Sequence, residues 1–474
     1  MKIINRPWWW VILLFIPIVN LIMFPVVWVE TIRSFGRTSA LDTFLVIVTL
    51  GLYIFYINYF AEVTYIEERS LKPRTAAGEW VSSILFAIIA ATLVHTYLIQ
   101  PFTIPTSSLE KTLLVGDFLF VSKFHYGART PLTAVAFPMV HDTIPGVGIK
   151  SYLEKPQIPY FRLPGFQEIE RTDIVVFNWP VDTMLNMYHT DKHYYKPIDK
   201  KTNYVKRAVG IPGDSLEIIN GRIHIDSRPL ELPDRAKPQY SYEGTTKGQP
   251  FNPRYLYERY DITDPVGYNS ASNTFRIHLT EESFQKFRNH PNVESIRRVI
   301  DSSGTGFGDI FPQKGDHSWN VDNLGPLFIP KKGATTSLNA DNLYAYKRLI
   351  EVYEGSEMNI ENKLAINGTQ VTLNGQPVDS YTFKQDYYYM MGDNRHNSLD
   401  SRYFGFVPES HIVGKPVFIW LSIDANASGF DKIRWHRMFT TVGGSGDPVS
   451  YLPYFLIIVL IVVAFNYFKK RRES

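Results

Sequence analysis

Three polar segments of the chain carry side chains whose types and order suit a hydrolytic reaction. Residues 106–108 (Thr-Ser-Ser) bring three hydroxyls together directly after an apolar stretch. Lys206 lies in the otherwise apolar, strand-like run 204–211, where a charged amine is unfavourable unless it is paired or neutral. The third segment, 390–402, is dense in small polar and charged residues. Each segment taken alone has an ordinary explanation: a loop or helix cap, a solvent-facing lysine, or a solvated turn.

A serine nucleophile needs a base that removes its proton, and a neutral lysine is one such base. Cysteine is absent, which excludes thiolate catalysis, disulfides and cysteine zinc sites. At its free pKa of about 10.4, a lysine is neutral in only about one molecule in a thousand at pH 7.4. Burial can lower this pKa by up to about 3 to 5 units. Val205, Ala208 and Val209 are the apolar neighbours expected to bury Lys206.

In this order, behind an apolar stretch, the three segments closely resemble the type I signal peptidase (leader peptidase) family, membrane serine proteases with a Ser/Lys dyad. Two further segments, Arg171–Phe177 and Gly405–Glu409, also match that family. The resemblance implies a β-rich catalytic domain with an inserted subdomain. It also implies that the chain is a serine endopeptidase, which removes N-terminal signal peptides from translocated preproteins through an acyl-enzyme.

The resemblance also assigns roles to individual residues. The nucleophile falls on Ser108 and its general base on Lys206. The oxyanion would be bound by the Thr106 hydroxyl and the backbone N–H of Ser108. The residue expected to orient the lysine is Ser398, and a structural ion pair supporting the site falls on Asp400 and Arg402. Leu109 and Lys111 depart from the family, which commonly has Met and Pro at these positions.

No cofactor or metal is expected. The 12 histidines show no metal-ligand spacing, so we expect His95 and His396 to be bystanders. A net charge of +3 gives no argument for nucleic acid as a partner. The expected partners are preproteins with signal peptides, membrane lipid and, transiently, the protein-export machinery.

Two other functions remain open. Ser108-x-x-Lys111 is also the nucleophile motif of penicillin-binding acyltransferases, although the chain lacks their Lys-Thr-Gly or Lys-Ser-Gly motif. We expect Lys111, beside Glu110 in a polar stretch, to stay solvated and charged. The alternative from another class is a catalytically inactive, membrane-anchored binding protein with the same fold. The intact serine, lysine and Ser398 argue against it.

Four apolar stretches indicate a membrane protein, because each is near the roughly 20 residues that cross a bilayer. They are Pro7–Val29, Thr43–Ala61, Trp80–Gln100 and Pro448–Phe468. Basic residues flank them at Lys2 and Arg6, at Arg69, Lys72 and Arg74, and at Lys469–Arg472. Basic residues favour the cytoplasmic side. This pattern predicts four transmembrane helices, with a re-entrant first segment as the alternative.

The predicted organisation has three parts. Residues 1–100 form a membrane domain with three helices, 101–447 the exported β-rich domain, and 448–474 a C-terminal helix with a basic cytoplasmic tail. Four spans without a transit peptide favour a bacterial plasma membrane, with the catalytic domain on the periplasmic (extracytoplasmic) side.

Two insertions, at about 124–170 and 230–345, lengthen the exported domain. The first is rich in apolar residues, and these either dip into the bilayer or pack on the core.

Local patterns predict the elements of the exported domain. Strands are expected at Phe118–Val121, Ile174–Phe177, Tyr387–Met391 and Val417–Leu421, and helices at Glu281–Val299 and Asn342–Tyr353. Asn-Gly pairs mark three expected hairpins, at Asn220-Gly221, Asn367-Gly368 and Asn374-Gly375.

Overall fold

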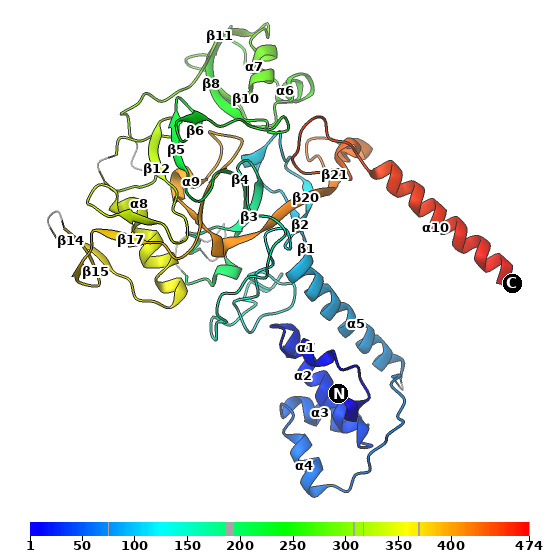
Figure 1. Cartoon of the computed structure of the whole chain (residues 1–474). Helices are drawn as coiled ribbons and strands as arrows, with labels where there is room; N and C mark the ends of the chain where they lie inside the picture. The colour runs from blue at the N-terminus through cyan, green and yellow to red at the C-terminus, as the bar shows by residue number, and fades with distance from the viewer. Residues whose placement is uncertain (74, 185–193, 307–308, 316, 368–369, 474) are drawn as a thin grey trace. The chain divides into compact units, whose positions relative to one another are not determined.

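The computed structural model describes residues 1–73, 75–184, 194–306, 309–315, 317–367 and 370–473. The chain divides into two compact units (Figure 1). Unit 1 comprises residues 1–100, 128–164 and 183–201, and unit 2 comprises 101–127, 165–182 and 202–474. Each unit is described by itself.

The described part of residues 1–100 in unit 1 contains five α-helices. They are α1 (Trp10–Leu13), α2 (Val19–Ser34), α3 (Ala40–Val48), α4 (Tyr53–Phe60) and α5 (Ala76–Leu93). Two helices among the described residues are long and apolar enough to cross a membrane. These are α5 with its π-helical extension, Ala76–Leu98, and the helix α10 (Leu452–Glu473) of unit 2. A bent pair, α3 with α4, could add a third crossing, so the prediction of four transmembrane helices is wrong.

The first apolar stretch fails to form one span because its helix is broken. Residues 14–18 separate α1 from α2, and Ile18 has a positive φ of 70°. The later part of α2 carries Glu30, which is buried and pairs with Arg6 at 3.0 Å and with Arg69. A break and a buried ion cluster thus replace the continuous apolar helix that composition alone suggests.

The second apolar stretch is bent by 120° between α3 and α4. The bend lies at Leu50 and Gly51, whose φ angles are 51° and 86°. A Cβ at Gly51 would lie 2.9 Å from the ring of Trp28, so glycine also permits the packing of this turn against α2.

The rest of unit 1 is largely irregular. Isolated antiparallel bridges, from Arg129↔Arg162 to Thr143↔Lys150, fold residues 128–164 into a long arm. The Asp199 carboxylate stabilises residues 128–164 by accepting hydrogen bonds from the backbone N–H groups of Leu132 and Thr133. The apolar side chains of this insertion fall into a buried and an exposed group. Leu132, Ala136 and Tyr152 are buried, whereas Phe137, Met139, Phe161 and Leu163 are exposed.

The centre of unit 2 is an eight-stranded sheet in the order β1-β2-β20-β3-β4-β18-β19, with β21 paired to β20. These strands are β1 (Ile99–Thr103), β2 (Asp117–Ser122), β3 (Ile174–Asn178), β4 (Asn203–Gly210), β18 (Tyr387–Met391), β19 (Val407–Pro408), β20 (Ile412–Ser422) and β21 (Thr440–Thr441). The β-rich character of the domain is confirmed, and so are the four strands predicted from local patterns.

A second sheet, in the order β11-β8-β10-β9, forms a subdomain within the second insertion. Its strands are β8 (Gln239–Thr246), β9 (Gly267–Asn269), β10 (Thr274–Thr280) and β11 (Val293–Arg298), with helices α6 (Pro253–Tyr260) and α7 (Glu281–Phe287). Its core includes Tyr242, Leu256, Phe275 and Phe287. The predicted helix over 281–299 is wrong beyond Phe287, because Pro291 interrupts it and residues 293–298 pair with β8.

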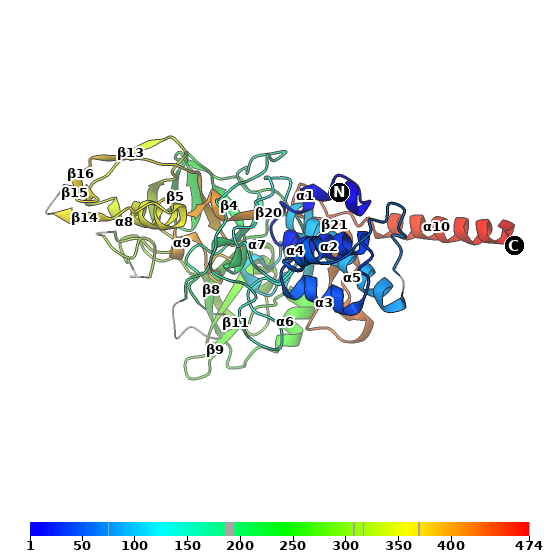
Figure 2. The same cartoon turned by 90° about the horizontal axis from the view of Figure 1, so that it is seen from below.

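Three smaller sheets complete unit 2, in the orders β12-β5-β6-β7, β13-β17 and β14-β15-β16. The first contains β5 (Ser215–Ile219), β6 (Arg222–Ile225), β7 (Arg228–Pro229) and β12 (Leu324–Phe328). The others contain β13 (Thr335–Ser337), β14 (Leu364–Asn367), β15 (Gln370–Leu373), β16 (Gln376–Pro377) and β17 (Ser380–Thr382). Helix α8 (Leu343–Arg348) gathers with β14 and β15 at one end of the unit in both views (Figures 1 and 2).

Two of the Asn-Gly hairpins are confirmed. Asn220-Gly221 joins β5 to β6, and Asn374-Gly375 joins β15 to β16. The Asn367-Gly368 turn lies partly outside the described residues. The helix predicted over 342–353 is confirmed as α8 followed by a π-helical turn, Leu349–Tyr353.

Candidate active site

The serine turn, which we define as residues 106–111, follows β1 and contains a short 3₁₀ helix, Ser107–Leu109. Leu109 is buried in an apolar cluster with Ile104 and Leu113, so the backbone of the turn is anchored while the Ser108 side chain stays partly accessible. The Ser108 N–H lies in the first turn of this helix, where amides have no intrahelical acceptor.

Lys206 meets the serine turn from the central sheet. It lies on β4, opposite Val175 of β3, and β18 pairs with the other edge of β4. The Lys206 side chain is buried, with only 4% of the residue exposed. Its Nζ donates to Ser108 Oγ at 2.7 Å and to its own strand's Val205 carbonyl at 3.2 Å. The structure therefore brings together the two residues that sequence analysis placed at the centre of the site.

Burial lowers the pKa of Lys206 to about 8, while the carboxylates of Asp400 and Asp393 act in the opposite direction. Burial acts this way because a low-dielectric surrounding disfavours the ammonium form. Val205, Ala208 and Val209 belong to three separate apolar clusters around this strand, in agreement with the expected burial. A useful fraction of Lys206 is therefore neutral near physiological pH.

The Gly392 loop, which we define as residues 392–402, faces the serine turn from the end of β18. A Cβ at Gly392 would overlap Ser398 Oγ and would lie 2.5 Å from the Ser108 carbonyl oxygen, so only glycine fits there. Ser398 is therefore close to the serine turn. Its buried hydroxyl has no hydrogen-bond partner among the described residues, and no bond to Lys206 is formed.

Two buried ion pairs hold the Gly392 loop. The expected pair of Asp400 and Arg402 is present at 2.8 Å, and Asp400 also accepts from the Gly392 N–H at 3.0 Å. The second pair joins Arg207 to Asp393 through two hydrogen bonds, of 2.8 and 2.6 Å. Sequence analysis gave no role to Arg207 or Asp393, although the position of Arg207 beside Lys206 in a buried strand was a signal that it needed a partner.

Thr106 lies at the N-terminal end of the 3₁₀ helix and is exposed. It lies within the serine turn, two residues before Ser108.

Lys111 was expected to be solvated, but the structure buries it. Its side chain is only 8% exposed, and its ammonium lies 2.9 Å from Asp261 in the second insertion. Glu110 is also buried, and it accepts from Thr263 Oγ1 at 3.0 Å. The turn that looked polar in sequence is therefore covered by the insertion, which sequence patterns did not reveal.

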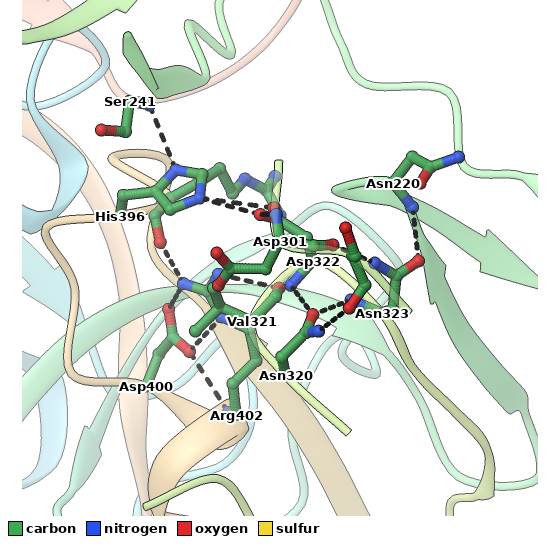
Figure 3. A network of polar contacts seen from close by, with 12 residues as sticks. Asn220, Ser241, Asp301, Asn320, Val321, Asp322, Asn323, His396, Asp400 and Arg402 are labelled. Atoms are coloured by element: carbon green, nitrogen blue, oxygen red, sulfur yellow. Dashed lines mark hydrogen bonds and ion pairs between the residues drawn. The ribbon is translucent and has the colours of Figure 1, made fainter. Parts of the chain in front are cut away.

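His396, which was not expected to be a metal ligand, makes contacts with two parts of the second insertion. Its Nδ1 accepts from the Ser241 N–H at 3.2 Å, and its Nε2 lies 3.3 Å from the Asp322 carboxylate (Figure 3). Burial opposes ionisation of Asp322, but the hydrogen bond from His396 contributes to holding its pKa below the usual value. His396 thus ties the Gly392 loop to the second insertion, and the part of the chain that the structure describes shows no metal-binding cluster around it.

A serine hydroxyl in contact with a buried lysine, on a β-rich domain that also carries apolar helices, defines a class of membrane-associated proteins with a serine–lysine centre. The family model described as "Signal peptidase, peptidase S26" matches residues 77–273 and 333–421. These residues make up more than half of the chain, and the chain belongs to that family. A separate family model, described as a family of unknown function, matches residues 1–68.

Curated relatives agree with the family assignment. Signal peptidase I of Haemophilus influenzae is 24% identical over 400 residues, which cover 79% of this chain and 79% of the relative. Signal peptidase I of Buchnera aphidicola is 25% identical over 375 residues, covering 77% and 82%. Signal peptidase I of Helicobacter pylori is 25% identical over 384 residues, covering 77% and 92%.

Proposed function

We propose that this chain is a signal peptidase I-like endopeptidase that removes N-terminal signal peptides from translocated preproteins. The observation that carries the proposal is the 2.7 Å hydrogen bond between Lys206 Nζ and Ser108 Oγ, made by a lysine buried in a β-sheet. Membership of the signal peptidase family supports preproteins with signal peptides as the class of substrate. We place the protein in a bacterial plasma membrane, with residues 101–447 on the extracytoplasmic side.

In the proposed reaction, neutral Lys206 takes the Ser108 Oγ proton as the oxygen attacks the scissile carbonyl carbon. The oxyanion is stabilised by the Ser108 N–H and the Thr106 hydroxyl. The lysine then gives its proton to the leaving amine, and an ester links the signal peptide to Ser108. Water hydrolyses this ester with Lys206 again as the base. The lowered pKa of Lys206 supports this cycle, because the base must be neutral at the start of each half-reaction.

Ser398 is proposed to orient Lys206, and the pair of Asp400 and Arg402 to support the Gly392 loop. The buried, unpartnered Ser398 hydroxyl beside the serine turn supports the first role. The full burial of the ion pair supports the second, because removing one partner of such a pair leaves an uncompensated charge.

The competing Ser-x-x-Lys chemistry would use Lys111 as the base. Lys111 is engaged with Asp261, whereas Lys206 contacts the Ser108 hydroxyl directly. The geometry therefore favours Lys206.

A peptide assay tests the proposal. The purified protein is given a fluorogenic peptide with an Ala-x-Ala site. We expect Ser108→Ala and Lys206→Ala to lose turnover while keeping the wild-type Tm within a few degrees. Lys111→Ala is expected to retain measurable turnover. Turnover lost in Lys111→Ala but kept in Lys206→Ala would favour the Ser-x-x-Lys mechanism, and an inactive wild type would favour a binding protein with this fold.

A further inference from the structure

A short segment of the second insertion contacts the serine turn. This insert loop, which we define as residues 261–264, directly follows α6. Three of its side chains contact the site. Two of these contacts are made with the end of the serine turn. Asp261 pairs with the Lys111 ammonium at 2.9 Å, and Thr263 Oγ1 donates to the Glu110 carboxylate at 3.0 Å. The third is made by Asp264, and it reaches the Gly392 loop.

Asp264 is buried and accepts hydrogen bonds from two amide side chains of the Gly392 loop. Asn394 Nδ2 donates to Asp264 Oδ2 at 2.6 Å, and Asn397 Nδ2 donates to the same oxygen at 3.3 Å. The carboxylate therefore holds both amides from the side of the insertion.

The same two amides hold the serine turn. Asn394 Nδ2 donates to the Ser107 carbonyl at 3.2 Å, and the Asn394 backbone N–H donates to the Ser108 carbonyl at 3.1 Å. Asn397 Nδ2 donates to Ser107 Oγ at 3.0 Å. The carbonyls on both sides of the Ser108 Cα are thus bonded to Asn394, and the Asn394 and Asn397 side chains connect the turn to Asp264.

The charge of Asp264 makes this arrangement directional. Burial opposes its ionisation, but the His278 side chain, 3.5 Å away, and the hydrogen bonds from Asn394 and Asn397 outweigh burial and hold the pKa of Asp264 below its usual value. An ionised carboxylate only accepts hydrogen bonds, so both asparagines must turn their NH₂ groups toward it. Charge-assisted bonds of this kind are about twice as strong as neutral ones. A neutral amide at position 264 would not impose that orientation.

We infer that the insert loop is a positioning element of the active site, and that Asp264 is its main positioning residue, acting on Ser108 through Asn394 and Asn397. The inference deepens the proposed function and rests on it. A positioning role matters because a misplacement of about 1 Å in a reacting group can reduce the rate about 10²-fold. The second insertion then belongs to the catalytic unit of the protein.

A kinetic cycle tests the inference on the full-length protein in detergent. Asp264→Asn, which keeps the size of the side chain, should lower kcat on the Ala-x-Ala peptide about 10-fold or more and leave KM within about 2-fold. Asn394→Ala should have a similar effect. The double variant should be little worse than either single variant, because residues that act through one another are not additive. Additive effects, or a change confined to KM, would overturn the inference.

The matched control is Glu243→Gln, another carboxylate-to-amide change in the same subdomain. Glu243 pairs with Arg297 and Arg276 on the sheet, away from the contacts of the insert loop. We expect its kcat to equal that of the wild type. A loss in Glu243→Gln equal to that in Asp264→Asn would show a general effect of the subdomain and would contradict the assignment to Asp264.

Hydrogen–deuterium exchange separates this inference from the proposed function. Peptides covering residues 104–116 should exchange faster in Asp264→Asn than in the wild type, and at the wild-type rate in Glu243→Gln. This result would support the positioning contact even if the wild type cleaved no peptide, in which case the proposed function alone would fall. Unchanged exchange in Asp264→Asn would overturn the positioning role whatever the activity.

Discussion

Burial of Lys206 has one consequence for reactivity and another for stability. The neutral amine that can accept a proton from Ser108 is available because the strand, the serine turn and the Gly392 loop keep water from it. The same burial disfavours the ammonium form. The folded protein must therefore either hold Lys206 neutral or lose stability to a buried charge. Both effects are measurable as a function of pH.

The pH profile is the first prediction. Because the pKa of Lys206 is lowered to about 8, kcat/KM of the wild type should rise with pH and level off above a midpoint near that value. The Asp400 carboxylate acts to raise this pKa, so its loss in Asp400→Asn should move the acidic limb to lower pH. Initial rates measured at subsaturating peptide would check this. An acidic limb that stays in place or moves upward would contradict the assignment of the base.

The second prediction concerns stability. The folded pKa of Lys206 is about 8 against an ordinary value of 10.5, so the unfolded chain binds more protons between these pH values. The free energy of unfolding of the wild type should therefore increase as the pH rises through this window. Below the window, the buried charged lysine lowers that free energy by about 3 kcal/mol. Lys206→Met lacks the titrating amine.

Thermal unfolding in detergent should give Lys206→Met a higher Tm than the wild type at pH 6. The difference should shrink as the pH approaches 10.5. A lower Tm for Lys206→Met at pH 6 would mean that the charged lysine stabilises the fold.

At the scale of elements, the Gly392 loop is held against the serine turn by close backbone packing. The third prediction is that Gly392→Ala lowers activity at least 10²-fold, because the added methyl group would displace Ser398 or the Ser108 carbonyl. Gly267→Ala in β9 is the control, since the nearest atom to its Cβ would be 3.7 Å away. Peptide turnover and Tm of the two variants would check this. Equal activity of both variants would contradict the close approach.

Much of the local structure could be predicted from the sequence. The Asn-Gly turns at 220–221 and 374–375 need only local backbone geometry, and they form as expected. Contacts between Ser108 and Lys206 could be expected because family motifs fix both positions. The prediction of a helix beyond Phe287 was wrong because it gave more weight to apolar spacing than to Pro291. Proline is excluded from a helix interior.

Other features depend on tertiary contacts that no local pattern carries. The insert loop lies about 150 residues from the serine turn along the chain, and its Asp261 and Asp264 resemble ordinary solvated carboxylates in sequence. The partner of Lys111 was missed for the same reason. In the membrane region, apolar composition predicted spans, but the breaks at Ile18 and Gly51 arise from positive φ angles that composition does not reveal.

At the scale of the whole molecule, the helices constrain the topology. The fourth prediction is that α5 and α10 both cross the membrane, so that residue 240 lies outside and residue 68 and the C-terminus lie in the cytoplasm. Basic residues support this, because Lys72 precedes α5 and Lys469–Arg472 end α10. Reporter fusions at the three positions would check the arrangement. Equal signals at residue 240 and at the C-terminus would contradict an exported active site.

The most direct test of the central claim uses the full-length protein in lipid vesicles with a purified preprotein that carries an Ala-x-Ala site. Mass spectrometry of the products identifies the cleaved bond, and Ser108→Ala in the same vesicles is the control. We predict that the wild type releases the mature protein by cutting directly after Ala-x-Ala, and that Ser108→Ala releases none. Cleavage by Ser108→Ala at the wild-type rate, or an intact preprotein with the wild type, would contradict the account.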